Sequence, residues 1–77
     1  MIIIKCVKCK EKIFKYNKIG QGRILKVYYS RVEKDYSLKE DGEIKCCNCK
    51  NIIGYKMGNY IKMKLNSFIY TGHKIKL

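Results

Sequence analysis

The sequence predicts a small, mainly β domain that occupies residues 1–77. Three observations predict this class. Segments rich in β-branched and aromatic residues follow one another along the chain, no window has a convincing helical periodicity, and two C-x-x-C motifs are present. A chain of 77 residues buries a smaller share of its surface than a large domain does, so its stability is marginal without a crosslink.

Two segments of the chain follow related patterns, each built around a C-x-x-C motif. The first is residues 4–14 and the second is residues 44–54. In both, an apolar residue and a lysine precede the first cysteine, and an apolar pair follows soon after the second. We name each segment a knuckle and interpret the two as copies of one structural unit.

The cysteines of the two knuckles predict a closed metal site. Structural Zn²⁺ takes four tetrahedral ligands, and a C-x-x-C turn presents two sulfurs to the metal with little strain. Because 36 residues separate the two motifs, an ordered insertion must lie between them. The expected ligands are Cys6, Cys9, Cys46 and Cys49. The fold is therefore expected to be a zinc-stabilised β domain that depends on its metal.

Other interpretations of these cysteines stay open. Cys47 could replace Cys46, although Cys46 and Cys49 repeat the spacing of the first motif. Simple burial would not explain the clustering, and a redox-active C-x-x-C normally accompanies a βαβ pattern. Iron also binds four thiolates in rubredoxin, but rubredoxins are acidic and carry glycine where this basic chain has Lys10 and Lys50. Zinc is therefore the expected metal.

Between the knuckles, the sequence predicts a hairpin followed by an acidic loop. Residues 20–22, Gly-Gln-Gly, indicate a turn, and residues 23–29 indicate a strand whose expected hairpin partner is residues 12–16. Residues 30–43 hold five of the six acidic side chains. We expect this acidic stretch to be a solvated loop, with room for one helical turn.

Beyond the second knuckle, the sequence predicts further strands. Residues 52–57 and 60–65 flank a Gly-Asn turn, and residues 60–65 alternate apolar residues with lysines, as a half-buried strand does. Residues 68–70 and 74–77 would form a last short hairpin. His73, the single histidine, lies in the turn of that hairpin and is expected to be a loop residue and not a ligand.

The chain is strongly basic, with 18 Lys and Arg against 6 acids and a formal charge of +12. Such an excess suggests an anionic partner such as nucleic acid. The inference is weakened because lysine, isoleucine, asparagine and tyrosine are all abundant, as in proteins from A- and T-rich genomes. Lysine also lacks the planar fork with which arginine binds phosphate and guanine.

The apolar segments are too short for a membrane span or a secretory signal. We therefore expect a cytoplasmic protein with no membrane contact. A reducing compartment favours metal-bound thiolates over disulfides, and the odd number of five cysteines points the same way.

The knuckles resemble those of the Com family of phage zinc-finger translational regulators. Residues 4–15 match the pattern I-[KR]-C-x-x-C-x-x-x-[LI]-F-K, and residues 43–50 match E-I-[KR]-C-x-x-C-K. The spacer is much longer than in Com, and the region after Gly54 has no counterpart there. The long β insertion is similar instead to the Mss4-like or Yippee-type β-tent, an alternative to a zinc ribbon. Com-like kinship implies RNA binding, whereas tent-like kinship implies mainly the fold.

Nucleic acid is the partner that we expect, RNA more than DNA. The basic side chains would form one continuous face that neutralises phosphates, and tyrosines would stack unpaired bases. The expected contacts are Lys8, Lys10, Lys12, Arg23, Lys26, Tyr28, Lys45 and Lys50. The alternative is a protein-interaction module in which zinc only supports the fold. An enzyme is not expected, because four cysteines close the metal shell and the histidine has no evident partner.

Overall fold

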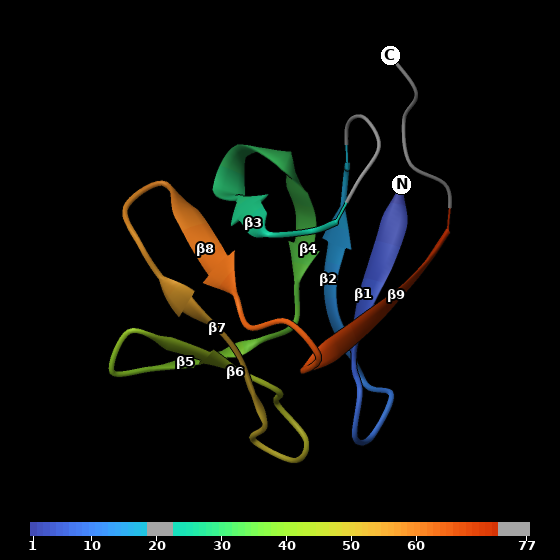
Figure 1. The fold of residues 1–77 in the computed structure, drawn as a ribbon, viewed down its shortest axis with the longest axis vertical. Helices are drawn as coiled ribbons and strands as arrows, with labels where there is room; N and C mark the ends of the chain where they lie inside the picture. The colour runs from blue at the N-terminus through green and yellow to red at the C-terminus, as the bar shows by residue number, and fades with distance from the viewer. Residues whose placement is uncertain (19–22, 73–77) are drawn as a thin grey trace.

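A computed structural model describes residues 1–18 and 23–72 of the chain. Within these residues, nine strands and one short 3-10 turn form two antiparallel sheets (Figure 1). The turn predicted at residues 20–22, the strand predicted at residues 74–77 and His73 lie outside the described residues. The prediction of a mainly β fold is confirmed.

The first sheet has the strand order β4-β2-β1-β9. Its central strand β1 (Ile2–Cys6) pairs with β2 (Lys12–Tyr16) on one side and with β9 (Phe68–Gly72) on the other. The 3-10 turn η1 (Tyr29–Arg31) leads into β4 (Val32–Asp35), which extends the sheet beside β2. The start of the chain is thus paired on both sides.

The second sheet has the strand order β3-β8-β7-β6-β5. The strands are β3 (Lys26–Tyr28), β5 (Leu38–Glu40), β6 (Glu43–Lys45), β7 (Ile52–Lys56) and β8 (Tyr60–Met63). Every pair of neighbours is antiparallel. The predicted hairpin around the Gly-Asn turn is confirmed, because β7 pairs with β8 across it.

One hydrophobic cluster joins the two sheets. Alternate residues of β1 are buried, as expected for a strand with one face on a core. The cluster takes its largest fully buried side chains from both sheets: Ile2, Ile4, Ile13, Phe14, Tyr16, Val27, Ile44, Ile53 and Ile61. Each of these side chains contributes about 1.5–3 kcal/mol of hydrophobic free energy when it is fully buried.

Strand pairing between the knuckles differs from the prediction. Residues 12–16 form a strand, but β2 pairs with β1 and β4, whereas β3 pairs with β8 in the other sheet. The strand predicted over residues 23–29 is also shorter, since β3 spans only Lys26–Tyr28. β1 and β4 occupy both edges of β2, so β3 pairs with β8 instead.

The solvated loop predicted over residues 30–43 is also corrected. After the helical turn η1, the segment forms β4 and β5, which lie at the edges of different sheets. Their side chains are mostly exposed, with burial patterns that lack an apolar alternation. Edge strands tolerate charged residues on both faces, and this pattern is hard to distinguish from a loop in the sequence.

Gly54 lies where β7 passes close to β8. A Cβ at this position would lie 2.7 Å from the carbonyl oxygen of Lys62 and 2.8 Å from a side-chain carbon of Ile61. Only glycine therefore fits without moving the backbone of β8. No helix within residues 1–18 and 23–72 is long and apolar enough to cross a membrane.

Candidate metal centre and basic surface

The first knuckle is a tight turn that connects β1 to β2. The backbone N–H of Lys10 donates to the carbonyl of Cys6 at 2.9 Å, and the N–H of Cys6 donates to the carbonyl of Glu11 at 2.9 Å. A register shift between Ile4 and Lys5 accompanies the turn. These two hydrogen bonds hold the turn closed and fix the direction of the cysteine side chains.

The second knuckle repeats this geometry 40 positions later in the chain. The N–H of Lys50 donates to the carbonyl of Cys46 at 3.0 Å, and the N–H of Cys46 donates to the carbonyl of Asn51 at 2.9 Å. The register shift also recurs, between the equivalent residues of β6. The interpretation of the knuckles as two copies of one unit is confirmed.

Both knuckles place a lysine in the left-handed backbone region. The φ angle is 63° at Lys10 and 61° at Lys50. Glycine adopts this conformation freely, whereas a residue with a Cβ loses about 1–2 kcal/mol. The Nζ of Lys10 donates to the carbonyl of Val7 at 2.9 Å, which offsets part of this cost in the first knuckle.

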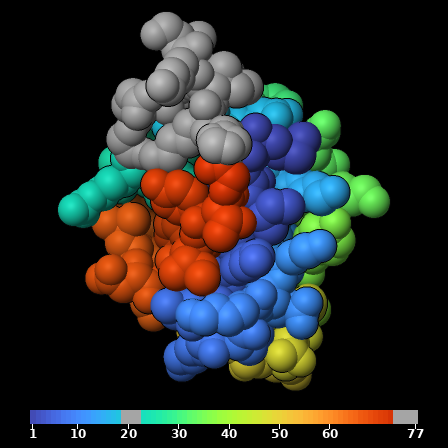
Figure 2. Space-filling model, turned by 90° about the vertical axis from the view of Figure 1, so that its right-hand side faces the viewer, coloured from blue at the N-terminus to red at the C-terminus, as the bar shows by residue number. Residues whose placement is uncertain are grey.

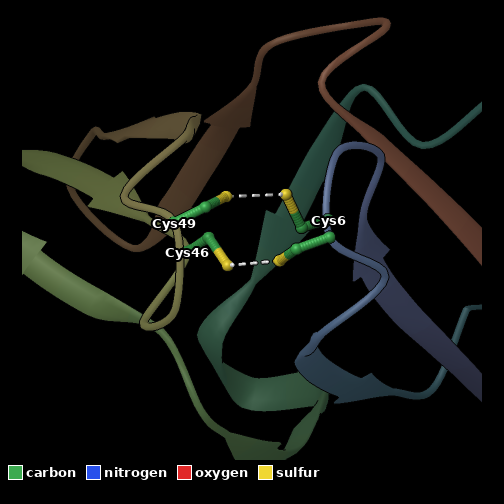
Figure 3. A group of neighbouring side chains, drawn as sticks. Cys6, Cys46 and Cys49 are labelled. Carbon is green, nitrogen blue, oxygen red and sulfur yellow. Dashed lines mark hydrogen bonds between the residues drawn. The ribbon is translucent and has the colours of Figure 1, made fainter.

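Four sulfurs converge between the knuckles, and their Sγ atoms all lie within 4.8 Å of one another. The distance is 3.5 Å between the sulfurs of Cys6 and Cys49 and 3.4 Å between those of Cys9 and Cys46. Figure 3 shows Cys6, Cys46 and Cys49 pointing into the space between the two turns. Both of these short distances join one knuckle to the other.

The size of this cluster fits a tetrathiolate metal site. A tetrahedral ion with metal–sulfur bonds of about 2.3 Å separates its sulfurs by about 3.8 Å. A disulfide bond would instead require a sulfur–sulfur distance of about 2.05 Å, and all five cysteines are free thiols. The four sulfurs could therefore hold one metal ion with little movement, and that ion would link the two sheets.

Burial differs within each pair of cysteines. The first cysteine of each motif, Cys6 or Cys46, is fully buried, whereas Cys9 is half-buried and Cys49 is exposed. The site therefore lies at the boundary of the core, with its outer sulfurs accessible to an incoming ion. Cys47 is exposed and does not belong to the cluster of four. Figure 2 shows the two knuckles meeting at the lower end of the molecule, the first in blue and the second in yellow.

Asn51 connects the second knuckle to the first. Its Nδ2 lies 3.6 Å from the sulfur of Cys6, to which it donates, and it also donates to the carbonyl of Ser67 at 3.2 Å. Hydrogen bonds of this kind orient metal ligands and stabilise the charge on a thiolate. The sequence reasoning missed this residue, whose signal was a polar amide two positions after a knuckle cysteine.

Asn48 acts on the sulfurs in a similar way. A hydrogen bond with its side chain lowers the pKa of Cys9 to about 6. Its backbone N–H donates to the sulfur of Cys46 at 3.4 Å, but burial dominates there and raises the pKa of Cys46 to about 12. A metal ion would compensate for this burial, because it neutralises the thiolates that it binds.

The predicted nucleic-acid contacts form two groups in the structure. Figure 1 places the knuckle loops at its lower end and β3 in its upper half. The knuckle group consists of Lys8, Lys10, Lys12, Lys45 and Lys50, and the β3 group consists of Arg23, Lys26 and Tyr28. Lys45 also forms ion pairs with Glu40 and Glu43, at 3.5 and 3.6 Å. The structure therefore does not bring the predicted contacts together at one end of the molecule.

The second sheet presents tyrosines and lysines on its solvent face. Lys26 lies opposite Lys62, Tyr28 lies opposite Tyr60, and Tyr55 lies opposite Lys62. Because paired residues share a face, these five side chains lie on one side of the sheet, and we name them the tyrosine face. Sequence reasoning identified only two of them, Lys26 and Tyr28, although the alternation within residues 60–65 was a signal for Tyr60 and Lys62.

Aromatic contacts order this face. The rings of Tyr28 and Tyr60 have centroids 5.9 Å apart. The Nζ of Lys26 lies 4.8 Å from the centroid of Tyr60, and the guanidinium of Arg31 lies 5.3 Å from that of Tyr28. Both rings are partly exposed. The two neighbouring rings thus lie between two cations, Arg31 and Lys26.

The fold and the cysteine cluster together define the class of the protein. It is a small, mainly β protein whose four clustered cysteines could coordinate a metal ion, which is compatible with a metal-stabilised β domain. No protein family, no curated protein and no solved structure matches the chain.

Proposed function

We propose that Cys6, Cys9, Cys46 and Cys49 hold one structural Zn²⁺ that locks the two sheets together. The observation that carries this proposal is the convergence of two equivalent knuckles on a cluster of sulfurs within 4.8 Å. Four thiolates complete the tetrahedral shell of zinc and leave no position for a substrate. Zinc is preferred to iron because of the basic charge of the chain and the lysines in place of the rubredoxin glycines.

Metal analysis of the purified protein tests the site. One zinc per chain is expected by native mass spectrometry, with four thiols protected from alkylation and Cys47 modified. A chelator should abolish cooperative thermal unfolding, because structural zinc supplies folding free energy directly. Visible thiolate-to-iron absorbance would assign iron instead. A metal-free chain that unfolds cooperatively and ignores chelators would contradict the proposal.

We further propose that the domain binds single-stranded RNA. Support comes from the tyrosine face, which combines stacking surfaces with positive charge, as proteins that bind unpaired bases do. Charge adds to this support, since one Zn²⁺ with four thiolates would leave about +10 of the formal +12. The likeness of the knuckles to those of Com points in the same direction.

The position of the acidic residues favours the β3 edge of the same surface. Glu43 lies opposite Tyr55, at the end of the tyrosine face that is farther from β3. The ion pairs described in the structure join Lys39 to Asp35 and Lys45 to Glu40 and Glu43, near β5 and β6. On the tyrosine face, Lys26 lies against the ring of Tyr60 and not against a carboxylate. An approaching phosphate backbone would therefore meet positive charge at the β3 edge of the sheet.

Titration of a fluorescent single-stranded RNA at several salt concentrations tests this function. Affinity should fall steeply as salt rises, because bound phosphates release counterions. Tyr60→Leu should weaken binding by about 5-fold or more, since stacking contributes about 1–3 kcal/mol per base. Tyr70→Leu, which changes an exposed tyrosine of the other sheet, is the matched control and should bind normally.

DNA of the same sequence provides the comparison between nucleic acids and should bind more weakly. Undetectable RNA binding at low salt would remove the proposal. It would favour the alternative of a protein-interaction module, whose partner should remain bound after nuclease treatment and at high salt.

A further inference from the structure

A basic pocket of about 210 Å³ lies beside the tyrosine face, at the β3 edge of the second sheet. The residues that line it include four cations and two tyrosines: Lys18, Arg23, Lys26, Arg31, Tyr16 and Tyr28. None of the described residues that line it is acidic. The pocket therefore concentrates positive charge around a small volume.

The two tyrosines form a rigid wall of the pocket. Tyr16 belongs to the first sheet and is 1% exposed, and its hydroxyl accepts the backbone N–H of Tyr28 at 3.1 Å. This bond ties β3 to the first sheet, so the pocket spans the junction between the sheets. Tyr28 also belongs to the tyrosine face, and a base stacked on that face would lie next to the pocket.

Two of the cations are positioned by aromatic rings. Arg31 stacks over Tyr28 and Lys26 over Tyr60, with distances of 5.3 and 4.8 Å to the ring centroids. Such contacts hold the charged groups through the ring face and leave their N–H groups as donors. Arginine can then form paired hydrogen bonds with phosphate oxygens.

We propose that this pocket binds a terminal phosphate of the RNA strand, an inference that rests on the proposed RNA-binding function. A terminal phosphate carries a charge of about −1.5 to −2 and three acceptor oxygens, whereas an internal phosphodiester carries a single negative charge. The charge of four cations matches a terminal phosphate better than it matches an internal phosphodiester. The pocket is also smaller than the roughly 300–1,000 Å³ of ordinary ligand sites, so it suits one small group at the end of a longer molecule.

Three forms of one short RNA test the proposal: a form with hydroxyls at both ends, a 5′-phosphorylated form and a 3′-phosphorylated form. One of the phosphorylated forms should bind about 10-fold more tightly than the hydroxyl form at the same salt concentration, as expected for hydrogen bonds to a charged group. The end that shows the effect identifies the source of the phosphate. Inorganic phosphate should compete with this form and lower its affinity towards that of the hydroxyl form.

Two double variants test whether the preference for a phosphorylated RNA end arises in this pocket. Lys26→Gln with Arg31→Gln should abolish the preference for the phosphorylated end. Lys34→Gln with Lys56→Gln removes the same charge from exposed positions outside the pocket and should retain the preference. Both variants are first compared with the parent in metal content and cooperative unfolding. Arg23→Gln, an exposed position of the pocket, replaces the first double variant if that variant does not fold.

The outcomes separate this proposal from the RNA-binding function. Equal affinity for all three RNA forms would overturn the phosphate pocket and leave RNA binding intact. A preference that survives Lys26→Gln with Arg31→Gln, or that survives Arg23→Gln where this variant replaces the pair, would place the phosphate elsewhere. Failure of every RNA form to bind at low salt would overturn the function itself, and with it the RNA end as ligand.

Discussion

The two knuckles share a backbone but differ in their side chains. Each closes with the same pair of hydrogen bonds and places a lysine at positive φ. The first knuckle carries Glu11 where the second carries Asn51, and only the asparagine reaches a sulfur of the opposite knuckle. The cysteines and the turn therefore define the structure, while the other positions can differ in function.

The largest effect should come from replacing a ligand cysteine, and the adjacent cysteine outside the cluster provides the comparison. Cys46→Ser removes a fully buried sulfur of the cluster and should abolish zinc binding and cooperative unfolding, since zinc binding and folding are coupled. Cys47→Ser changes an exposed thiol outside the cluster and should leave both intact. Zinc content and thermal unfolding measure the difference. Loss of zinc in the Cys47 variant would reverse the ligand assignment.

An intermediate effect is expected from the residue that distinguishes the knuckles. Asn51→Ala removes the donor to the sulfur of Cys6 and to the carbonyl of Ser67. We expect a loss of about 1–3 kcal/mol of stability and of about 10- to 100-fold in zinc affinity. Glu11→Ala is the control, because the described contacts of Glu11 within the knuckle are made by its backbone, which the substitution keeps. Competition with a chelator gives the affinities, and equal affinities for the two variants would show that the knuckles are functionally equivalent.

The smallest effect should come from replacing by glycine the two lysines that have a positive φ angle. Lys50→Gly removes the Cβ penalty at positive φ and should raise the free energy of unfolding by about 1 kcal/mol or less, because glycine also loses more entropy on folding. Lys10→Gly should gain less, since it also loses the hydrogen bond from Nζ to the carbonyl of Val7. Denaturant titrations compare the two variants. Destabilisation by Lys50→Gly would show that the side chain has another role.

Local features of the structure were predictable from the sequence, whereas distant pairings were not. The knuckles are visible because their cysteines and apolar pairs repeat within short segments. The pairing of β1 with β9 and of β3 with β8 brings together strands that are far apart in the chain, and no local pattern specifies such partners. Each of these pairings depends on which edges remain open once the hairpins have formed.

The same difference between local and distant features applies to the side chains of the site. The cysteine cluster was expected from spacing alone, but the contact from Asn51 to Cys6 depends on how one knuckle faces the other. Likewise, Tyr28 was identified on its own strand, whereas its partner Tyr60 depends on the register between β3 and β8. Contacts across an interface between segments require the folded arrangement.

The short sulfur distances across the knuckles have a consequence for the order of assembly. Each turn closes within its own hairpin, and such local loops form on the microsecond scale or faster. Joining the turns requires closure of the 36-residue stretch between the motifs, and either turn alone offers an ion only two of its four ligands. The full ligand set therefore exists only once the second knuckle is present, and a nascent chain could complete the site only after the second hairpin has left the ribosome.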